Sequence, residues 1–340
     1  MSAPDLGGAA GARVGRYFSL VSALPSAVLV FYVYVLVSSG AWSGPPDWKR
    51  AASAVTGIGL GAAAALSVVS LLAGLVLHPL QFALVQLYEG YWGTSKTARL
   101  MATKRAMRRW HHVRALRAEE MALEMHIDGH PELSDPSRHW LRTTHFESGR
   151  VSTSFPKKPE LFMPTRLGNV LRRYETESGK PYRLNTIQVV PLLALVGQEK
   201  DVEYLNDQRG ALDLAVRMSV TSLIACALSI AFLWQDGLWL MISLIPYGFA
   251  YLFYRGAVVT AREYGTAMAA LILLNREALY KRIGIPKPAD TREERTQNEG
   301  LQQLLDHDGL ADLPYEPEPE LWWQRLDKRL FEKPDPGAQP

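Results

Sequence analysis

The fold of this chain is decided by the stretch Met218–Tyr254, which reads MSVTSLIACALSIAFLW-QDG-LWLMISLIPYGFAYLFY. Two uncharged runs, Met218–Trp234 and Leu238–Tyr254, are separated by only three residues, 235–237. Each run is close to the roughly 20 residues of helix that a hydrocarbon core about 30 Å thick requires. The Asp-Gly step between the runs favours a tight turn. The stretch therefore predicts a helical hairpin that crosses a membrane twice.

Two further apolar runs, Phe18–Val37 and Ala54–Leu77, lie upstream of this hairpin and contain no charged side chain. The first follows Arg13 and Arg16, as the core of a secretory signal does, but it is longer than the about 7–15 residues typical of such a core. The chain has 340 residues, of which 48% are apolar and 21% charged, and its net charge is +3. These features predict an all-α membrane protein with four transmembrane helices and a mainly helical cytoplasmic domain.

Lysine and arginine near the ends of the four runs predict the orientation, because cytoplasmic loops carry an excess of both. One side has Arg13, Arg16, Lys96, Arg209, Arg217, Arg255 and Arg262, whereas the other has only Lys49 and Arg50. Both termini are therefore expected in the cytoplasm. The outer interface then contains Trp42, Trp48, Trp234 and Trp239, as expected for amphipathic rings.

The four runs divide the chain into six segments. They are a cytoplasmic N-terminus (1–17), transmembrane helices 1 and 2 (18–78), a cytoplasmic helical domain (79–215), the transmembrane hairpin (216–256), a cytoplasmic helix extension (257–285) and an acidic, proline-rich tail with an amphipathic segment (286–340). Cys226 is the single cysteine, so no intrachain disulfide can form, and the soluble part is expected to face a reducing compartment.

Gly57, Gly61 and Ala65 recur every four residues in the second run. Small residues at this spacing let helix backbones approach closely, which predicts packing within the bundle, with a homo-oligomer face as the alternative. The segment 57–62 also matches a loose dinucleotide-binding fingerprint, but that motif follows a strand, and none is expected inside an apolar helix. No Asp, Glu, Lys or Arg lies within the four cores, which argues against a pump or an ion-coupled carrier.

A basic segment follows the second run. The residues Leu80–Trp92 are apolar and aromatic, which is typical of a segment lying at the inner interface. From Lys96 to Arg117 there are eight Lys or Arg and no acid, and the interleaved apolar residues predict an amphipathic helix; they are Leu100, Met107, Trp110 and Leu116. A solvated positive face, anionic lipid and nucleic acid remain open as interpretations, although nucleic acid lacks a recognition fold. The candidate lipid- or partner-binding residues are Arg105, Arg108 and Arg109.

Several shorter segments complete the helical pattern. The range 131–180 is rich in Pro, Ser, Arg and Gly, which predicts irregular structure around short helices. Ile187–Val196 is too short to span a bilayer and is expected to form a buried helix or an interface element. Periodic apolar residues continue from the hairpin to Leu279, and Gly284 and Pro286 are expected to end that helix.

A pair of histidines and a pair of tryptophans are further candidates for binding sites. His126 and His130 have the four-residue spacing of two metal ligands on one helix face, but Gly129 and Pro131 interrupt the helix and no zinc motif is present. No metal or cofactor is therefore expected. In the tail, Trp322 and Trp323 lie in an amphipathic stretch that suits the membrane surface, the body of the protein or a partner groove.

The stretch Met163–Arg172, MPTRLGNVLR, resembles a recurring segment of uncharacterised integral membrane proteins of bacteria, especially actinobacteria. Arg209–Leu214, the stretch from Glu263 through Leu279 to Pro286, and the run at 292–295 resemble the same family. The resemblance extends over roughly residues 75 to 305 and departs from the family pattern at Val189–Pro191. It implies a bacterial inner-membrane protein with a helical cytoplasmic region, and it assigns no activity.

The same stretch supplies candidate phosphate-binding residues, which are Arg166, Asn169, Arg172 and Arg173. The alternative interpretation assigns these residues to helix capping and loop structure. No nucleophile–base pair and no phosphate loop accompany them, so no catalytic residue is predicted. The sequence favours a non-enzymatic membrane scaffold or sensor whose cytoplasmic helices bind a protein partner or anionic lipid. A membrane-bound enzyme acting on a lipid or nucleotide, and an oligomeric pore, are the alternatives.

Overall fold

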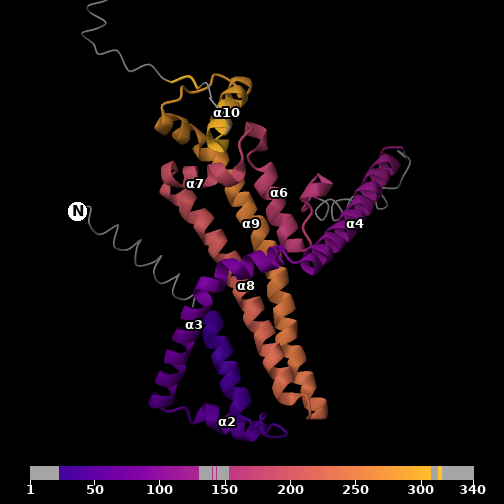
Figure 1. Ribbon diagram of the computed structural model, residues 1–340, viewed down its shortest axis with the longest axis vertical. Coiled ribbons are helices and arrows are strands. Elements are labelled where there is room, and N and C mark those ends of the chain that lie inside the picture. The colour runs from indigo at the N-terminus through magenta and orange to yellow at the C-terminus, as the bar shows by residue number, and fades with distance from the viewer. Residues whose placement is uncertain (1–22, 130–139, 141–142, 144–152, 308–312, 316–340) are drawn as a thin grey trace, which may run out of the picture.

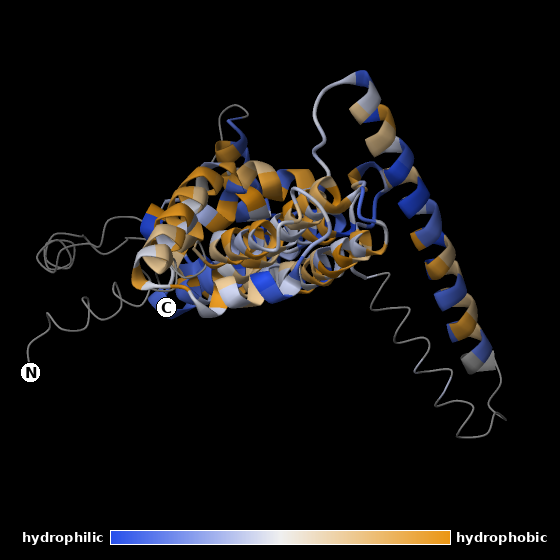
Figure 2. Ribbon diagram, turned by 90° about the horizontal axis from the view of Figure 1, so that it is seen from below, coloured by the Kyte–Doolittle hydropathy of each residue, from blue (hydrophilic) through white to orange (hydrophobic). Residues whose placement is uncertain are grey.

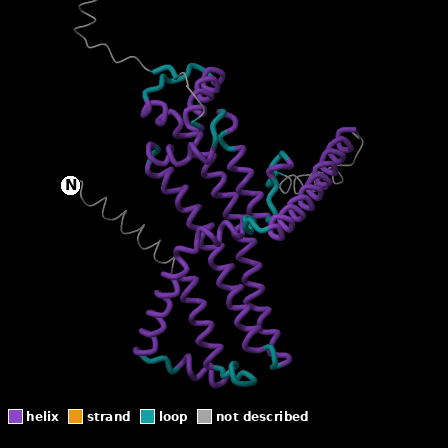
Figure 3. The backbone as a smooth tube through the Cα atoms, in the orientation of Figure 1, coloured by secondary structure: helices purple, strands orange, loops and turns teal. Residues whose placement is uncertain are grey.

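The computed structural model describes residues 23–129, 140, 143, 153–307 and 313–315, and this part of the chain contains helices and loops without strands (Figure 3). The all-helical prediction is therefore confirmed for the described residues. Along the chain the elements are the Ala23–Ser38 helix, α2 (Trp48–Thr56), α3 (Leu60–Glu89), α4 (Lys96–Gly129), η1 (Pro159–Leu161), α6 (Arg166–Glu177), η2 (Lys180–Tyr182), α7 (Thr186–Val196), α8 (Glu199–Leu233), η3 (Gly237–Ser243), α9 (Leu244–Ile283) and α10 (Thr291–Asp306).

Helices α8 and α9 form a long antiparallel pair that runs the length of the molecule (Figure 1). With 35 and 40 residues they are about 52 and 60 Å long, about twice the thickness of a bilayer core. The predicted hairpin is confirmed, and Gly237 adopts the left-handed φ of +57° in its turn. The second limb differs in one respect, since η3, a 3₁₀ helix, precedes α9. Gly284 ends α9 with a φ of +76°, as expected.

Three helical stretches are long and apolar enough to cross a membrane: Leu60–Leu77, Glu199–Leu233 and Gly237–Ile283. The first predicted run is described only as the Ala23–Ser38 helix, which is shorter than the 18 residues of a minimal span. Three of the four predicted spans are thus supported by length and composition, and the fourth stays a prediction.

The second predicted run does not form one helix. α2 ends at Thr56, Gly57 caps it, and α3 begins at Leu60 after Gly59. Gly57 therefore does not share a helix face with Gly61. The expected packing of these small residues within the bundle is wrong, because a Cβ atom on Gly61 would meet no heavy atom within 4 Å and no residue of Leu60–Leu77 is buried.

The end of the hairpin and α2 lie together at one end of the molecule (Figure 1). The ring of Trp48 on α2 lies 5.9 Å from that of Trp239 in η3, with a tilted geometry. Asp47 caps α2 by accepting from the amides of Lys49 and Arg50. Two tryptophans predicted for one interface therefore meet at the same level.

Helix α3 includes most of Leu80–Trp92, the segment that is expected to lie at the inner interface. Its residues continue without a break to Glu89, with Pro79 inside the helix. Figure 1 shows that α3 bends part-way along, as a proline that removes one backbone hydrogen bond allows. The bend carries the chain towards the start of α4. It leads away from the half of the molecule that contains the Ala23–Ser38 helix, α2, Leu60–Leu77 and the turn of the hairpin, which we call the membrane half. The proposed boundaries at 78, 215 and 256 fall within continuous helices, so the segments share α3, α8 and α9.

The other half of the molecule is a cluster in which α6, α7 and α10 surround α9 (Figure 1). α7 buries Val189, Val190 and Leu193 there, which confirms a buried short helix. The ring of Tyr174 on α6 lies so close to Gly265 that a Cβ atom at 265 would be 2.1 Å from it. Gly265 is thus needed for the approach of α6 to α9.

The start of α6 lies directly on the end of α3. Thr165 caps α6 and donates a 2.7 Å hydrogen bond from its hydroxyl to the carbonyl oxygen of Glu89. A Cβ atom on Gly168 would lie 1.9 Å from the same oxygen, and one on Gly90 would lie 2.3 Å from the ring of Pro164. Glycine at both positions permits this contact, which we call the α3–α6 junction.

Gly168→Ala is expected to destabilise the protein, because the added Cβ atom would overlap the Glu89 carbonyl and both groups belong to backbone. Overpacking costs about 1–3 kcal/mol of unfolding free energy, which lowers the melting temperature of the detergent-solubilised protein. Gly256→Ala on α9 is the matched control, since a Cβ atom added there would have no heavy atom of another residue within 4 Å outside the neighbouring helix backbone. It is expected to keep or raise the melting temperature. Equal melting temperatures for the two variants would show that the junction does not form.

Candidate functional site

The root of α4 lies at the α3–α6 junction and brings three arginines of the two predicted groups together. Arg109 donates a 2.8 Å hydrogen bond from Nε to the carbonyl oxygen of Pro164. Arg166, two residues further, donates its backbone N–H to the hydroxyl of Tyr254 at 3.3 Å. Arg105 places its guanidinium carbon 5.2 Å from the centroid of the Trp92 ring. We call Arg105, Arg109 and Arg166 the arginine cluster.

The charges around Arg109 are mainly positive. Burial lowers the pKa of its guanidinium, and Arg105 and Arg166 lower that pKa further, whereas Tyr254 raises it. None of the ion pairs found among the described residues involves a member of the arginine cluster. The Nε atom of Arg166 is buried and has no hydrogen-bond partner there. The cluster therefore holds uncompensated positive charge.

The other candidate phosphate-binding residues do not join this cluster. Asn169 is fully buried, and its amide donates to the carbonyl oxygens of Met163 and Thr165 and accepts from the N–H of Met163 at 3.0 Å. Its polar atoms hold the loop before α6, in line with the capping and loop interpretation. Arg172 donates to the Tyr91 hydroxyl at 2.6 Å and lies 3.7 Å from Glu175.

Arg173 and Arg108 also point elsewhere. The guanidinium carbon of Arg173 lies 5.5 Å from the centroid of the Tyr174 ring. Arg108 is exposed, while Arg109, next to it, is half-buried at the junction. Four predicted phosphate ligands thus separate into one arginine at the cluster and three residues with other contacts.

Next to Arg172, two carboxylates share a half-buried region that the sequence did not reveal. Burial, with a further contribution from Glu175, raises the pKa of Glu89 to about 7 against the opposing effect of Arg172. Burial also raises the pKa of Glu175, again against the effect of Arg172. One signal was present in the sequence, since Glu89 is the only acid between Asp47 and Glu119.

Helix α4 is attached to the body by one side only. Val113, Phe155 and Phe162 form a small buried cluster. Trp110 packs edge-on against it, and its ring centroid lies 5.2 Å from that of Phe162. Arg117 donates to the carbonyl oxygens of Phe155 and Pro156 at 3.3 and 3.0 Å. The helix is confirmed, and of the interleaved apolar residues Trp110 packs on the body, whereas Leu100 and Met107 are exposed.

The opposite side of α4 carries large apolar residues in solvent. Leu100, Met107, Arg114 and Met121 recur every seven residues and therefore share one face, and Met125 lies one turn beyond Met121. The exposed fractions of the four apolar side chains are 71% for Leu100, 55% for Met107, 63% for Met121 and 64% for Met125. We call these four residues the methionine face. Figure 2 shows α4 standing apart from the other helices, with hydrophilic and hydrophobic residues mixed along it.

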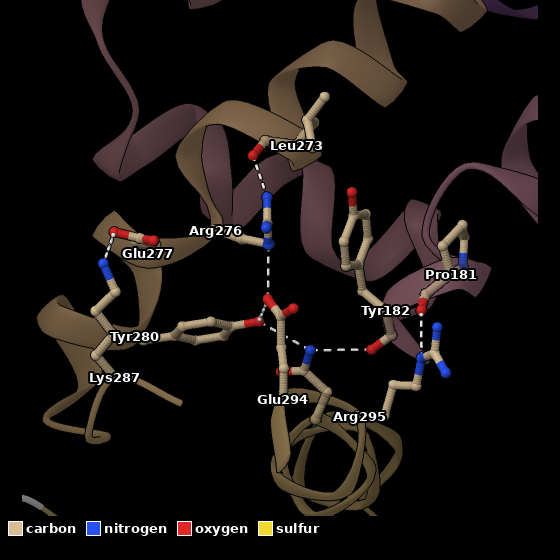
Figure 4. Close-up of polar contacts among 10 residues, drawn as sticks. Pro181, Tyr182, Leu273, Arg276, Glu277, Tyr280, Lys287, Glu294 and Arg295 are labelled. Atoms are coloured by element: carbon tan, nitrogen blue, oxygen red, sulfur yellow. Dashed lines mark hydrogen bonds and ion pairs between the residues drawn. The ribbon is translucent and has the colours of Figure 1, made fainter. Parts of the chain in front are cut away.

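At the far end of the molecule, α10 is fastened to α9 and η2 by a buried polar network (Figure 4). Glu294, 5% exposed, accepts from Arg276 Nε at 2.6 Å and from the Tyr280 hydroxyl at 3.1 Å. The Asn298 amide donates to that hydroxyl at 2.8 Å and to the Tyr182 carbonyl at 2.9 Å. Arg276 and Glu294 belong to the stretches that carry the family resemblance, and their structural role is to dock α10.

Two apolar cavities lie in the membrane half. One, of about 230 Å³, is lined by residues of the Ala23–Ser38 helix, α8 and α9, including Val28, Thr221 and Phe249. The other, of about 280 Å³, lies between the same helix, Trp48 and Ile242. Neither lining contains a charged side chain. They suit an apolar chain rather than a polar substrate.

Three of the candidate binding residues singled out in the sequence are not among those that the structure describes. Trp322, Trp323 and His130 lie outside the described residues. Within the described ranges, no group of three or more His, Cys, Asp or Glu side chains lies close enough together to hold a metal ion.

Glu89→Gln is expected to change the pH dependence of stability. The folded protein binds a proton at Glu89 with a pKa of about 7, above the ordinary 4.5, so stability falls as the pH rises from about 4.5 to about 7. The variant should melt at a higher temperature than the parent protein at pH 8 and show a flatter profile between pH 5 and 7. Glu203→Gln on the exposed side of α8 is the control and should reproduce the parent profile. A parent protein that melts at the same temperature at pH 5 and 8 would contradict this account of Glu89.

Glu294→Ala is expected to release α10. Arg276 and the Tyr280 hydroxyl would lose their buried acceptor, at a cost of about 2–3 kcal/mol of unfolding free energy. Limited proteolysis within α10 should become several-fold faster. Glu299→Ala on the same helix is the control, because its pair with Arg183 is half-exposed and such pairs contribute about 0–1 kcal/mol. If both variants were cut at the parent rate, the network would not hold α10 in place.

Comparison of the chain with known protein families, with characterised proteins and with solved structures finds no match. The resemblance of Met163–Arg172 to bacterial membrane proteins therefore stays a prediction.

Proposed function

We propose that this chain is a non-enzymatic scaffold of a bacterial inner membrane, in which α4 binds an acidic, amphipathic helix of a partner protein. Four transmembrane helices would anchor the scaffold, and both termini would lie in the cytoplasm. Support for the anchor comes from the three helical stretches that are long and apolar enough to span. Support for the orientation comes from the seven basic residues on one side of the runs against two on the other.

The methionine face is the observation that carries this proposal. Its four side chains are more than half exposed, although burying an apolar side chain of this size contributes about 1.5–3 kcal/mol. Methionine is unbranched and flexible, and it is common on surfaces that adapt to partner helices. A helix that lays its apolar side into such a surface would contact residues at the same spacing.

Charge defines the chemistry of the partner. The α4 segment from Lys96 to Arg117 has eight Lys or Arg and no acid, and Lys104 and Arg114 flank or share the methionine face. An acidic helix would pair with these cations at the rim while its apolar residues contact the methionines. Complementary charge of this kind raises the association rate and selects the partner.

The position of α4 favours a protein over a lipid surface for the far part of this face, which is Met121 and Met125. α4 leaves the junction and runs away from the membrane half of the molecule (Figure 1). Met121 is 25 residues beyond Lys96, which corresponds to about 38 Å along the helix. That distance is well beyond the roughly 8 Å over which surface charge acts at physiological salt.

The enzyme alternative has less support, because its candidate pocket residues have separate contacts. Asn169 is used by the loop, Arg172 by Tyr91 and Glu175, and Arg173 by Tyr174. The two cavities in the membrane half have no charged lining residue. A reaction needs converging groups, and the described residues supply none at these places.

Site-specific photo-crosslinking in native cells tests the scaffold proposal. A crosslinkable residue in place of Met107 or Met121 should form one major product with one protein, and the peptide attached should be acidic and helical. Lys104→Glu together with Arg114→Glu should reduce that product at least about tenfold, because charge complementarity becomes repulsion.

Leu304 on α10 is the matched control position, since it is apolar and 51% exposed but lies outside α4. A crosslinker there should not yield the same product. Crosslinks from positions 107 and 121 only to lipid, or only to residues 130–152 or 316–340 of the same chain, would overturn the proposal.

A further inference from the structure

The arginine cluster is the strongest candidate for a second binding site, on the other side of α4 from the methionine face. Arg105 and Arg109 lie four residues apart and so share one face of α4, and Arg166 is the first residue of α6. The bond from Arg109 Nε to the Pro164 carbonyl brings the two helices together at this point. Arg105 and Arg166 are both close enough to affect the charge of Arg109, so three arginines from two helices lie near one place in the fold.

This arrangement is unfavourable in the protein alone. Like charges at short range repel, and each guanidinium can donate five hydrogen bonds. Among the described residues, no carboxylate forms an ion pair with the cluster, and the buried Nε atom of Arg166 donates to nothing. The N-terminus of α6 adds positive partial charge to the same place. A bound anion would offset all of these effects.

Aromatic residues place the cluster at the level where the spans end. Tyr254, whose hydroxyl accepts from Arg166, is the last residue before Arg255 in the apolar run of α9. The ring of Tyr88 lies 5.8 Å from that of Tyr254, and Trp92 lies beneath Arg105. Tyrosine and tryptophan with this mixture of apolar and polar neighbours are enriched at the headgroup layer.

We propose that Arg105, Arg109 and Arg166 bind the phosphate of an anionic phospholipid headgroup in the leaflet from which α4 and α6 emerge. The site rests on the membrane placement proposed above, but not on a protein partner of α4. Arginine suits the ligand because its planar fork donates two parallel hydrogen bonds to phosphate oxygens. A lipid tethered to this point would fix the angle at which α4 leaves the membrane.

The surroundings distinguish this site from general attraction of cations to the membrane. Arg172 has a hydroxyl and a carboxylate partner, and Arg173 lies over Tyr174. Arg108 adjoins Arg109 in sequence, yet its side chain is exposed and belongs to a different side of α4. The same loss of charge at 108 and at 109 should therefore have different consequences.

Native mass spectrometry of the purified full-length protein tests the site. The protein would be prepared in mixed micelles with phosphatidylglycerol or with phosphatidylcholine, and the bound lipid would be counted as the lipid concentration is raised. Phosphatidylglycerol should bind at least about tenfold more tightly than phosphatidylcholine, whose headgroup carries no net charge. Arg109→Gln together with Arg166→Gln should remove at least about tenfold of that preference, whereas Arg108→Gln should change it less than about twofold.

Three controls accompany this measurement: the stability of the double variant, a conservative variant of Arg166, and a variant of the methionine face. The double variant should melt within a few degrees of the parent protein, and Arg166→Lys, which keeps the charge but loses the fork, should bind with intermediate affinity. Lys104→Glu with Arg114→Glu should leave lipid binding unchanged, so that failure of this site and failure of the methionine face are distinguishable. Equal losses for Arg108→Gln and the double variant would overturn the proposal. Displacement of phosphatidylglycerol by inorganic phosphate at equal concentration would also overturn it, since the site would then bind free phosphate.

Discussion

The carbonyl oxygen of Glu89 lies against the backbone of Gly168 and accepts the hydroxyl of Thr165, and the rest of the molecule depends on this contact. It joins the end of the bent helix α3 to the start of α6, which itself packs on α9. α3 contributes no buried residue along Leu60–Leu77, so its C-terminal part holds it to the body, through the junction and through hydrogen bonds of Gln81 with Asp213 and of Tyr88 with Ser219 on α8. The direction of α4, which begins seven residues after Glu89, follows from it.

The junction also explains the electrostatics around it. It partly buries Glu89 beside Glu175, which is why the pKa of Glu89 is raised to about 7 in spite of Arg172. On its other side it brings Arg109 to the Pro164 carbonyl and Arg166 to Tyr254. Glu89 and Glu175 on one side of this backbone contact form no ion pair with Arg105, Arg109 or Arg166 on the other.

Helix α4 has one side that faces the body and another that faces solvent. Trp110 and Val113 hold it to the body, Arg105 and Arg109 face the junction, and the methionine face points into solvent. A lipid phosphate at the root and a protein helix along the arm would use different sides of one helix. In the proposed scaffold, the membrane would then determine where the arm points and the partner would bind along it.

The helical class, the hairpin of α8 and α9, and the end of α9 at Gly284 are predictable from the amino-acid sequence, because these features depend on local properties. Uninterrupted apolar length, a turn at Asp236 and Gly237, and a glycine that accepts a positive φ are all readable from neighbouring residues. The break at Gly57–Gly59 was missed because small residues suit both a packed helix and a helix end.

Which arginines lie near one another depends on how the helices pack. Arg166 and Arg109 are 57 residues apart, and nothing near either one distinguishes Arg109 from Arg108 or Arg166 from Arg172. The buried side of α4 likewise depends on Phe155 and Phe162, which come from a distant loop, so the periodicity of α4 alone does not separate Trp110, which packs there, from Leu100 and Met107, which are exposed. Side-chain contacts across long sequence separations depend on how helices pack, and that packing is determined by close backbone approaches such as the one at Gly168.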